Sequence, residues 1–410
     1  MNRSNSSNRR KCVLFVDDER HLLCGLERLL FDYEESLDLR FAASGREALT
    51  ILESERVDVI FSDMRMPQMD GSQLLQNVQR QYPSTIRLML SGQAALNTII
   101  RTLGHAHQFL AKPCSAAQLK GSLENCLELS DVLERSQAAA YAAGLTSLPI
   151  APRTIAAVEV ELDSPEPVVT RIAEAASQDI GMSGKLLQIG AASLYHGIDP
   201  AASTAEIITT LGLDRFRPLV RDVCPFLRES DGYPLDEVET EEILHACRWV
   251  GRLSGLITEL ILPGDYHAKH MAISAGGLHR TGDLLIRSWM HAVTARADDG
   301  GSCFGSSAAV AESELSEAEL AGCLLKLWGL PVQVIEAVEN YRVPCRAQIS
   351  GFAPVTAVHL AHAIYDQLFG RSGAPAAIDS DYLELVGIGS RVQELLDACS
   401  HMIEAESAIV

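Results

Sequence analysis

Five polar residues near the start of the chain have the types needed for chemistry on an anion held beside a metal ion. Each follows directly on a short apolar run, and together they are Asp17, Asp18, Asp63, Ser91 and Lys112. Three carboxylates in one site repel each other unless a cation lies between them, and oxygen ligands with room for water suit Mg²⁺ better than zinc. A lysine offers a compact positive charge for an anion beside the metal, and a serine hydroxyl can bond to a phosphoryl oxygen. The set describes a site at which one carboxylate accepts a phosphoryl group.

The stretch Val57–Gly71 indicates that Asp63 is the acceptor. Its apolar beginning predicts a short buried strand that stops at Asp63, and Pro67 with Asp70–Gly71 indicates a loop directly afterwards. In an open α/β sheet, ligands bind at the carboxyl ends of the strands. The alternative is an ordinary turn aspartate, and the surrounding chain decides between the two.

Strand and helix patterns alternate five times in this part of the chain. The predicted strands span residues 12–16, 39–43, 57–61, 86–90 and 108–111, and the predicted helices span residues 21–31, 45–53, 72–81, 94–103 and 115–129. This alternation predicts a five-stranded parallel sheet with helices on both faces. Because the carboxyl ends of parallel strands meet at one edge, we expect the five polar residues to converge there.

With these residues in this order, residues 11–129 resemble the receiver domain of two-component response regulators. The resemblance implies a doubly wound, flavodoxin-like fold and makes Asp63 the phosphoacceptor, assisted by Lys112. It also implies that Ser91 is a switch hydroxyl and Phe109 a switch aromatic. The Lys112–Pro113 pair matches a pair whose peptide bond is typically cis in this family.

The same resemblance implies a magnesium site. Asp18, Asp63 and the backbone carbonyl of Arg65 would hold the Mg²⁺. Asp17 would contact the ion through a water molecule or support the residues that bind it directly. The cognate histidine kinase is the partner that the resemblance implies for phosphorylation of Asp63.

Composition limits the other classes of function. The chain has 410 residues, 47% of them hydrophobic, which predicts two or three globular domains. A formal net charge of −20 argues against direct binding to nucleic acid or to an anionic membrane surface. The ten cysteines contain no Cys-x-x-Cys pair, and no apolar run is long enough to span a bilayer. We therefore expect a cytoplasmic protein.

Polar or helix-forming stretches separate the predicted domains. Residues 1–10 are polar and basic, which predicts a disordered tail rather than a secretory signal. Residues 130–144 continue an apolar stripe and then run through an alanine-rich segment. Two interpretations stay open for this junction: a continuous signalling helix, or a helical linker that serves only as a spacer. Residues 401–410 are expected to form a C-terminal tail.

Residues 145–400 read almost entirely as helices and resemble the HDOD domain, an output module related to the HD phosphohydrolases. The resemblance depends on short landmarks in the family's order: Leu148–Pro149 with Pro152, Gln178–Leu187, Leu211–Gly212, Leu278–Gly282 and Trp328–Pro331. Ile180 stands where the family usually has proline.

The metal ligands of an active HD phosphohydrolase are missing from these landmarks. His279 is followed by Arg280, a permanent cation, where an active relative would have aspartate. Glu317 and Asn340–Tyr341 occupy positions where histidines would be expected, and the remaining histidines look scattered. Gly232–Pro234 spells the tripeptide of HD-GYP phosphodiesterases but precedes His279, so we interpret it as a turn. No cofactor is predicted for this half.

Three functions follow from this organisation. The first is a response regulator that signals by contact through a noncatalytic HDOD domain, to an unknown downstream protein or within a homodimer. The second is a receiver-controlled phosphohydrolase, such as a cyclic-di-GMP phosphodiesterase, and the loss of the aspartate after His279 counts against it. The third is a ligand-binding sensor that has kept a nucleotide pocket and lost the metals.

Overall fold

The computed structural model describes residues 9–92, 102, 104–145, 147–192, 202–223, 227–228, 237–298, 315–370 and 376–407. Contacts between residues divide the chain into two units. The first contains residues 1–146 and 192–194, and the second contains residues 147–191 and 195–410. In the described part of the chain, no helix is both long and apolar enough to cross a membrane.

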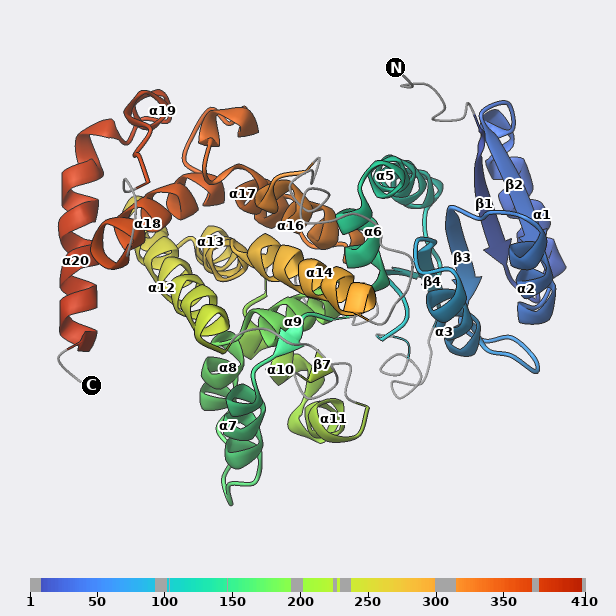
Figure 1. Cartoon of the computed structure of the whole chain (residues 1–410), viewed down its shortest axis with the longest axis horizontal. Coiled ribbons are helices and arrows are strands. Elements are labelled where there is room, and N and C mark those ends of the chain that lie inside the picture. The colour runs from blue at the N-terminus through green and yellow to red at the C-terminus, as the bar shows by residue number, and fades with distance from the viewer. Residues whose placement is uncertain are drawn as a thin grey trace. The chain divides into compact units, whose positions relative to one another are not determined.

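The apolar runs of the first unit form a parallel sheet, as predicted (Figure 1). Its strands are β1 (Lys11–Val16), β2 (Leu37–Ala42), β3 (Val59–Asp63), β4 (Ile86–Ser91) and β5 (Gln108–Ala111). Their order is β2-β1-β3-β4-β5, and every neighbouring pair is parallel. The chain thus winds outward from β1 in both directions, which confirms the flavodoxin-like arrangement.

Helices cover the sheet and enclose its central strands. They are α1 (Arg20–Leu29), α2 (Gly45–Ser54), α3 (Gly71–Gln81), α5 (Ala116–Arg135) and α6 (Gln137–Gly144), with a 3₁₀ turn η1 at Phe31–Tyr33. Phe15 of β1 stacks on Phe61 of β3 at 4.8 Å and on Phe41 of β2 at 5.7 Å between ring centroids. The predicted helix at residues 94–103 lies almost entirely outside the described residues.

The junction is not one continuous helix. Helix α5 runs past the predicted boundary at residue 129 and ends at Arg135. Ser136 then has extended backbone angles, and its hydroxyl accepts a hydrogen bond from the Ala139 amide at 3.2 Å. A serine that caps a new helix in this way ends the preceding one. The continuous signalling helix was therefore the wrong alternative.

The described residues of the second unit form helices and one short parallel strand pair, β6 (Pro149–Ile150) with β7 (Leu227–Arg228). Its first helices are α7 (Pro152–Leu162), α8 (Val169–Ser177), α9 (Ile180–Ala191), α10 (Thr204–Leu211) and α11 (Leu213–Pro218), with a π-turn η2 at Leu219–Val223. The later ones are α12 (Glu237–Ile261), α13 (Tyr266–Leu278), α14 (Thr281–Asp298), α16 (Glu317–Leu327), α17 (Val332–Asn340), α18 (Pro354–Phe369), α19 (Ser380–Leu385) and α20 (Val392–Ser407), with 3₁₀ turns η4 (Pro344–Ala347) and η5 (Gly389–Arg391). Helix α20 thus continues into the segment predicted as a tail.

Close helix contacts in the second unit depend on glycines. A Cβ atom on Gly276 of α13 would lie 2.7 Å from the Cα atom of Gly251 on α12, so these two helices touch through their backbones. A Cβ atom on Gly282 would lie 1.8 Å from the carbonyl oxygen of Glu317, which joins the start of α14 to the start of α16. Close packing against α16 therefore explains why glycine stands at position 282, the end of the Leu278–Gly282 landmark.

Replacement of Gly282 by alanine should lower the free energy of unfolding of the second unit by about 1–3 kcal/mol, because the backbone of α16 must move away. All three tryptophans, Trp249, Trp289 and Trp328, belong to this unit, so their fluorescence in a urea titration reports on it alone. The control is Gly277→Ala, since nothing lies within 4 Å of that Cβ position. It should be neutral or slightly stabilising; equal losses in both variants would contradict the packing role of Gly282.

Candidate functional site

The ammonium group of Lys112 lies between two carboxylates at the carboxyl edge of the sheet. Its Nζ donates to Asp17 Oδ2 at 2.6 Å and also to Asp63 Oδ1. Asp17 follows β1, Asp63 ends β3 and Lys112 follows β5, so three strands deliver one side chain each. The predicted convergence of these residues is present in the structure.

Backbone contacts hold the acceptor carboxylate in place. Asp63 Oδ2 accepts a hydrogen bond from the Arg65 amide at 2.6 Å. The loop after β3 closes tightly, because the Gly71 amide donates to the Met64 carbonyl at 3.0 Å. A Cβ atom on Gly71 would lie 2.1 Å from the carbonyl oxygen of Asp63, so this position requires glycine.

Opposing effects set the protonation of Lys112. Burial lowers its pKa, but the hydrogen bonds to Asp17 and Asp63 outweigh burial and leave the pKa above its usual value. Lys112 is therefore a fixed cation at neutral pH. The Lys112–Pro113 peptide bond is cis, as the resemblance implied.

The two residues predicted to act as a switch lie on neighbouring strands, with both side chains buried. Ser91 is 1% exposed; its hydroxyl donates to the Gly92 carbonyl at 3.1 Å and lies 3.7 Å from Met64 Sδ. Phe109 is 5% exposed, so its ring is buried in this structure.

The predicted magnesium ligands fit the ion by their chemistry. Carboxylate and carbonyl oxygens are what Mg²⁺ prefers, and Asp18, Asp63 and the Arg65 carbonyl supply both kinds. Asp18 is exposed at the end of β1, next to the buried Asp17. Among the described residues, no three acidic, histidine or cysteine side chains are grouped closely enough to hold a metal ion. In this arrangement the ammonium group of Lys112 offsets the negative charges of Asp17 and Asp63.

The residual HD position is buried and carries a cation. His279 is 1% exposed, and its Nδ1 donates to the Gly276 carbonyl at 2.7 Å. Arg280 binds both carboxylate oxygens of Asp283, at 2.9 and 3.2 Å. Burial lowers the pKa of Arg280, but the bonds to Asp283 outweigh it and raise the pKa overall. Burial, together with nearby His362 and Arg280, holds the pKa of His279 well below its usual value.

Two further aromatic side chains surround His279. The His362 ring centroid lies 5.3 Å from that of His279, and the Tyr341 centroid lies 5.2 Å from it. The expectation that the other histidines are scattered was therefore wrong for His362, since α18 brings it to the HD position. Glu317 is paired with Arg342 at 3.0 Å rather than directed at a metal. The Gly232–Pro234 tripeptide lies outside the described residues.

Sequence reasoning also missed a buried pair at the opposite edge of the receiver sheet. Arg87 is 0% exposed in β4, and His107, immediately before β5, is 2% exposed. The signal was an arginine inside an otherwise apolar predicted strand, where a charge needs a structural reason. No short motif pointed to His107.

Comparison with known proteins assigns a family to each unit. Residues 13–124 match the family model of the response regulator receiver domain, and residues 148–344 match that of the HDOD domain. The transcriptional regulatory protein GlrR of Escherichia coli is 33% identical over 119 residues, which are 29% of this chain and 26% of that protein. The response regulator protein PilR of Pseudomonas aeruginosa is 34% identical over 121 residues, which are 29% of this chain and 27% of that protein.

A solved receiver domain of an HD domain-containing protein from Pseudomonas fluorescens is 34% identical to this chain, covers 30% of it and 99% of its own length, and has a TM-score of 0.29. The chain spans about a quarter of the length of the curated relatives that it matches. The comparisons therefore concern the two domains, and the activity of the whole protein is a separate question.

Replacement of Lys112 by methionine should destabilise the first unit by about 1–2 kcal/mol at pH 8, because Asp17 and Asp63 lose their shared cation. Hydrogen exchange of the β1 and β3 amides in the full chain measures this. Lys120→Met is the control, since Lys120 lies 3.8 Å from an exposed Asp32 and should contribute little. An equal loss in both variants would contradict this role of Lys112.

Proposed function

Because this chain carries a response regulator receiver domain followed by an HDOD domain, we propose that it is a two-component response regulator phosphorylated on Asp63 by a histidine kinase. Its output would be contact with another protein through a noncatalytic HDOD domain, in the cytoplasm. The observation that carries the proposal is the bridge from Lys112 to both Asp17 and Asp63.

Phosphorylation would be a simple displacement at phosphorus. A carboxylate oxygen of Asp63 attacks the phosphoryl group of the kinase phosphohistidine, the phosphorus–nitrogen bond breaks, and the imidazole leaves with its electron pair. Mg²⁺ bound by Asp18, Asp63 and the Arg65 carbonyl would offset the charge of the phosphoryl oxygens. Lys112 supports the proposal because its ammonium group already contacts Asp63 and can follow the added charge.

The new charge would then act on the strands beside Asp63. Ser91 would exchange its bond to the Gly92 carbonyl for one to a phosphoryl oxygen, and the surroundings of Phe109 would change with it. The face formed by β5, α5 and the segment before β5 is the surface expected to respond. Such a response is a shift between two states, limited by the difference in their free energies.

The HDOD unit supports a role in contact rather than in catalysis. A divalent metal at His279 would be brought beside the guanidinium of Arg280, which keeps its charge at any physiological pH. Asp283 is the carboxylate next to this position, and Arg280 already binds both of its oxygens. The charges favour a packed helical module over a metallohydrolase.

Acetyl phosphate with Mg²⁺ should add one phosphoryl group to the wild-type protein, detected as a mass increase of the intact chain. Asp63→Asn should abolish the labelling, because an amide oxygen cannot form the acyl phosphate. Asp70→Asn is the matched control: Asp70 is in the same loop and caps α3, which asparagine can also do. Equal labelling of wild type and Asp63→Asn would refute the assignment of Asp63.

The purified protein should contain far less than one equivalent of iron or manganese, and it should not hydrolyse cyclic-di-GMP. Metal analysis and chromatography of the nucleotide products measure the two properties. Hydrolysis that disappears in His279→Ala would instead favour the alternative, a receiver-controlled phosphohydrolase.

A further inference from the structure

The buried arginine of β4 binds the backbone of three other segments of the first unit. Arg87 Nε donates to the His105 carbonyl at 2.7 Å, and Nη1 donates to the carbonyls of Pro83 and Thr85 at 3.1 and 2.9 Å. Its Nη2 donates to the Ala143 carbonyl in the last turn of α6 at 3.1 Å. In the described part of the chain it has no carboxylate partner, and burial lowers its pKa to about 9. Among the described residues, the partners of this charge are backbone carbonyls and the His107 ring, whose Nε2 lies 2.9 Å from Arg87 Nη2.

His107 binds the same carbonyl. The Arg87 amide donates to His107 Nδ1 at 3.1 Å, so in the neutral ring the proton is on Nε2. That Nε2–H can donate to the Ala143 carbonyl at 2.8 Å. The backbone also ties the two residues together, since the His107 amide donates to the Arg87 carbonyl at 2.8 Å. We call Arg87 and His107 the α6 clamp.

The clamp binds α6 where a helix attracts cations. The last carbonyls of a helix lack partners within it and carry the negative end of the helix dipole. Gln79 of α3 adds a weaker contact to the next carbonyl, that of Gly144, at 3.5 Å. Helix α6 is short and rich in alanine, so its own stability is small. It depends on these hydrogen bonds together with the burial of its alanine face.

The strands that bear the clamp also bear the switch residues. In β4, Arg87 is near the amino end and Ser91 is at the carboxyl end. His107 immediately precedes β5, and Phe109 lies within β5. The register pairs Met89 with Phe109 and Ser91 with Ala111, so β4 and β5 move as one ladder. A shift at the phosphorylation edge is thereby passed to both donors of the clamp.

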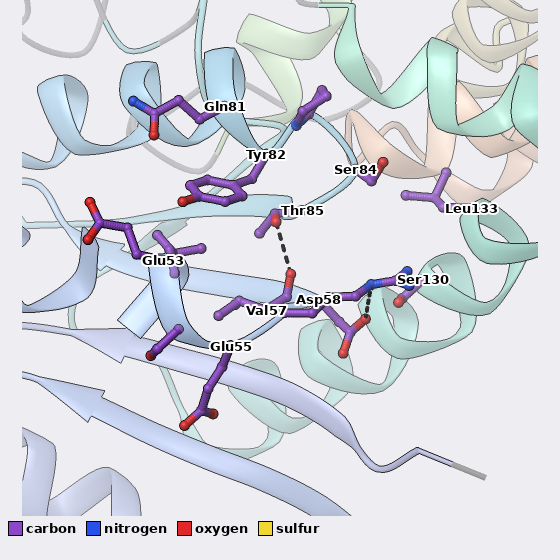
Figure 2. A pocket seen from close by; sticks show the side chains of 14 residues that line it. Glu53, Glu55, Val57, Asp58, Gln81, Tyr82, Ser84, Thr85, Ser130 and Leu133 are labelled. Atoms are coloured by element: carbon purple, nitrogen blue, oxygen red, sulfur yellow. Dashed lines mark hydrogen bonds and ion pairs between the residues drawn. The ribbon is translucent and has the colours of Figure 1, made fainter. Parts of the chain in front are cut away.

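One wall of the clamp has room to move. The loop Tyr82–Thr85 supplies two of the four carbonyls and borders a cavity of about 580 Å³, with Glu53–Asp58 on another side. Figure 2 shows this cavity, in which the Thr85 hydroxyl donates to the Val57 carbonyl at 2.9 Å. A buried guanidinium loses much of its stabilisation when one of its acceptors moves away. Small shifts of β4 or of this loop can thus release α6.

We propose that the α6 clamp couples phosphorylation of Asp63 to the stability of helix α6, the last helix of the first unit before the HDOD domain. The coupling rests on the proposed function, because it takes the phosphorylated aspartate as its input. Arg87 and His107 act as positioning residues and do not touch the phosphoryl group.

Hydrogen exchange of the full-length protein, with and without acetyl phosphate and Mg²⁺, tests the coupling. In wild type, phosphorylation should change the exchange rates of the α6 amides by at least about threefold. In Arg87→Met, the α6 amides should exchange about tenfold faster before phosphorylation and should change no further after it. Arg40→Met is the control. Arg40, on β2, forms a half-exposed ion pair with Glu55, so this variant should leave the exchange rates of α6 unchanged.

The intact mass of each sample keeps the two proposals apart. If Asp63 is labelled but the α6 rates of wild type do not change, the coupling is wrong and the proposed function stands. If Asp63 is not labelled, the proposed function fails, and unchanged α6 rates in Arg87→Met would refute the clamp as well.

Should Arg87→Met not fold, His107→Gln serves instead, since glutamine can donate to Ala143 but cannot also accept from the Arg87 amide with the same geometry. Its α6 rates should lie between those of wild type and those of His107→Ala; equal rates in all three would refute the clamp.

Discussion

The carboxylates of Asp17 and Asp63 stand at the ends of neighbouring strands, and without Lys112 they would repel each other across that edge. Parallel strands force this situation, because every strand delivers its last residue to the same side of the sheet. The lysine comes from the outer strand and reaches back across β4's end to contact both acids. The shape of the loop after β3 follows from the same need, since Gly71 allows the chain to close directly over the carbonyl of Asp63.

The sequence was sufficient to predict this edge and insufficient for the opposite one. Asp63, Lys112 and Asp17 each follow a run of apolar residues, and topology alone then brings them together. From the sequence, Arg87 was visible only as a charged residue in a strand predicted to be buried. Most of its acceptors are backbone carbonyls, which every residue type carries, so no sequence pattern reveals them. The end of α5 was missed for a related reason: helix propensity remains high across Ser136. The break there consists of extended backbone and a serine hydroxyl that accepts a hydrogen bond from the Ala139 amide.

The second unit keeps the packing around the position where the family resemblance places the HD pair. Gly282 still allows the backbones of α14 and α16 to touch, and His279 still lies buried against Tyr341 and His362. Arg280 stands where the resemblance leads one to expect an acid, and its charge is balanced by Asp283, which it contacts through both carboxylate oxygens. The histidines looked scattered because His279 and His362 are far apart in the sequence. Helix α18 brings the His362 ring to His279.

The break at Ser136 has a mechanical consequence. A single rod from α5 through α6 would pass on rotation about its axis, and each inserted residue would turn everything beyond it by about 100°. The extended backbone at Ser136 interrupts such a rod. The length of α5 is therefore not tied, through a continuous helix, to the strict residue spacing that a rotating rod would impose.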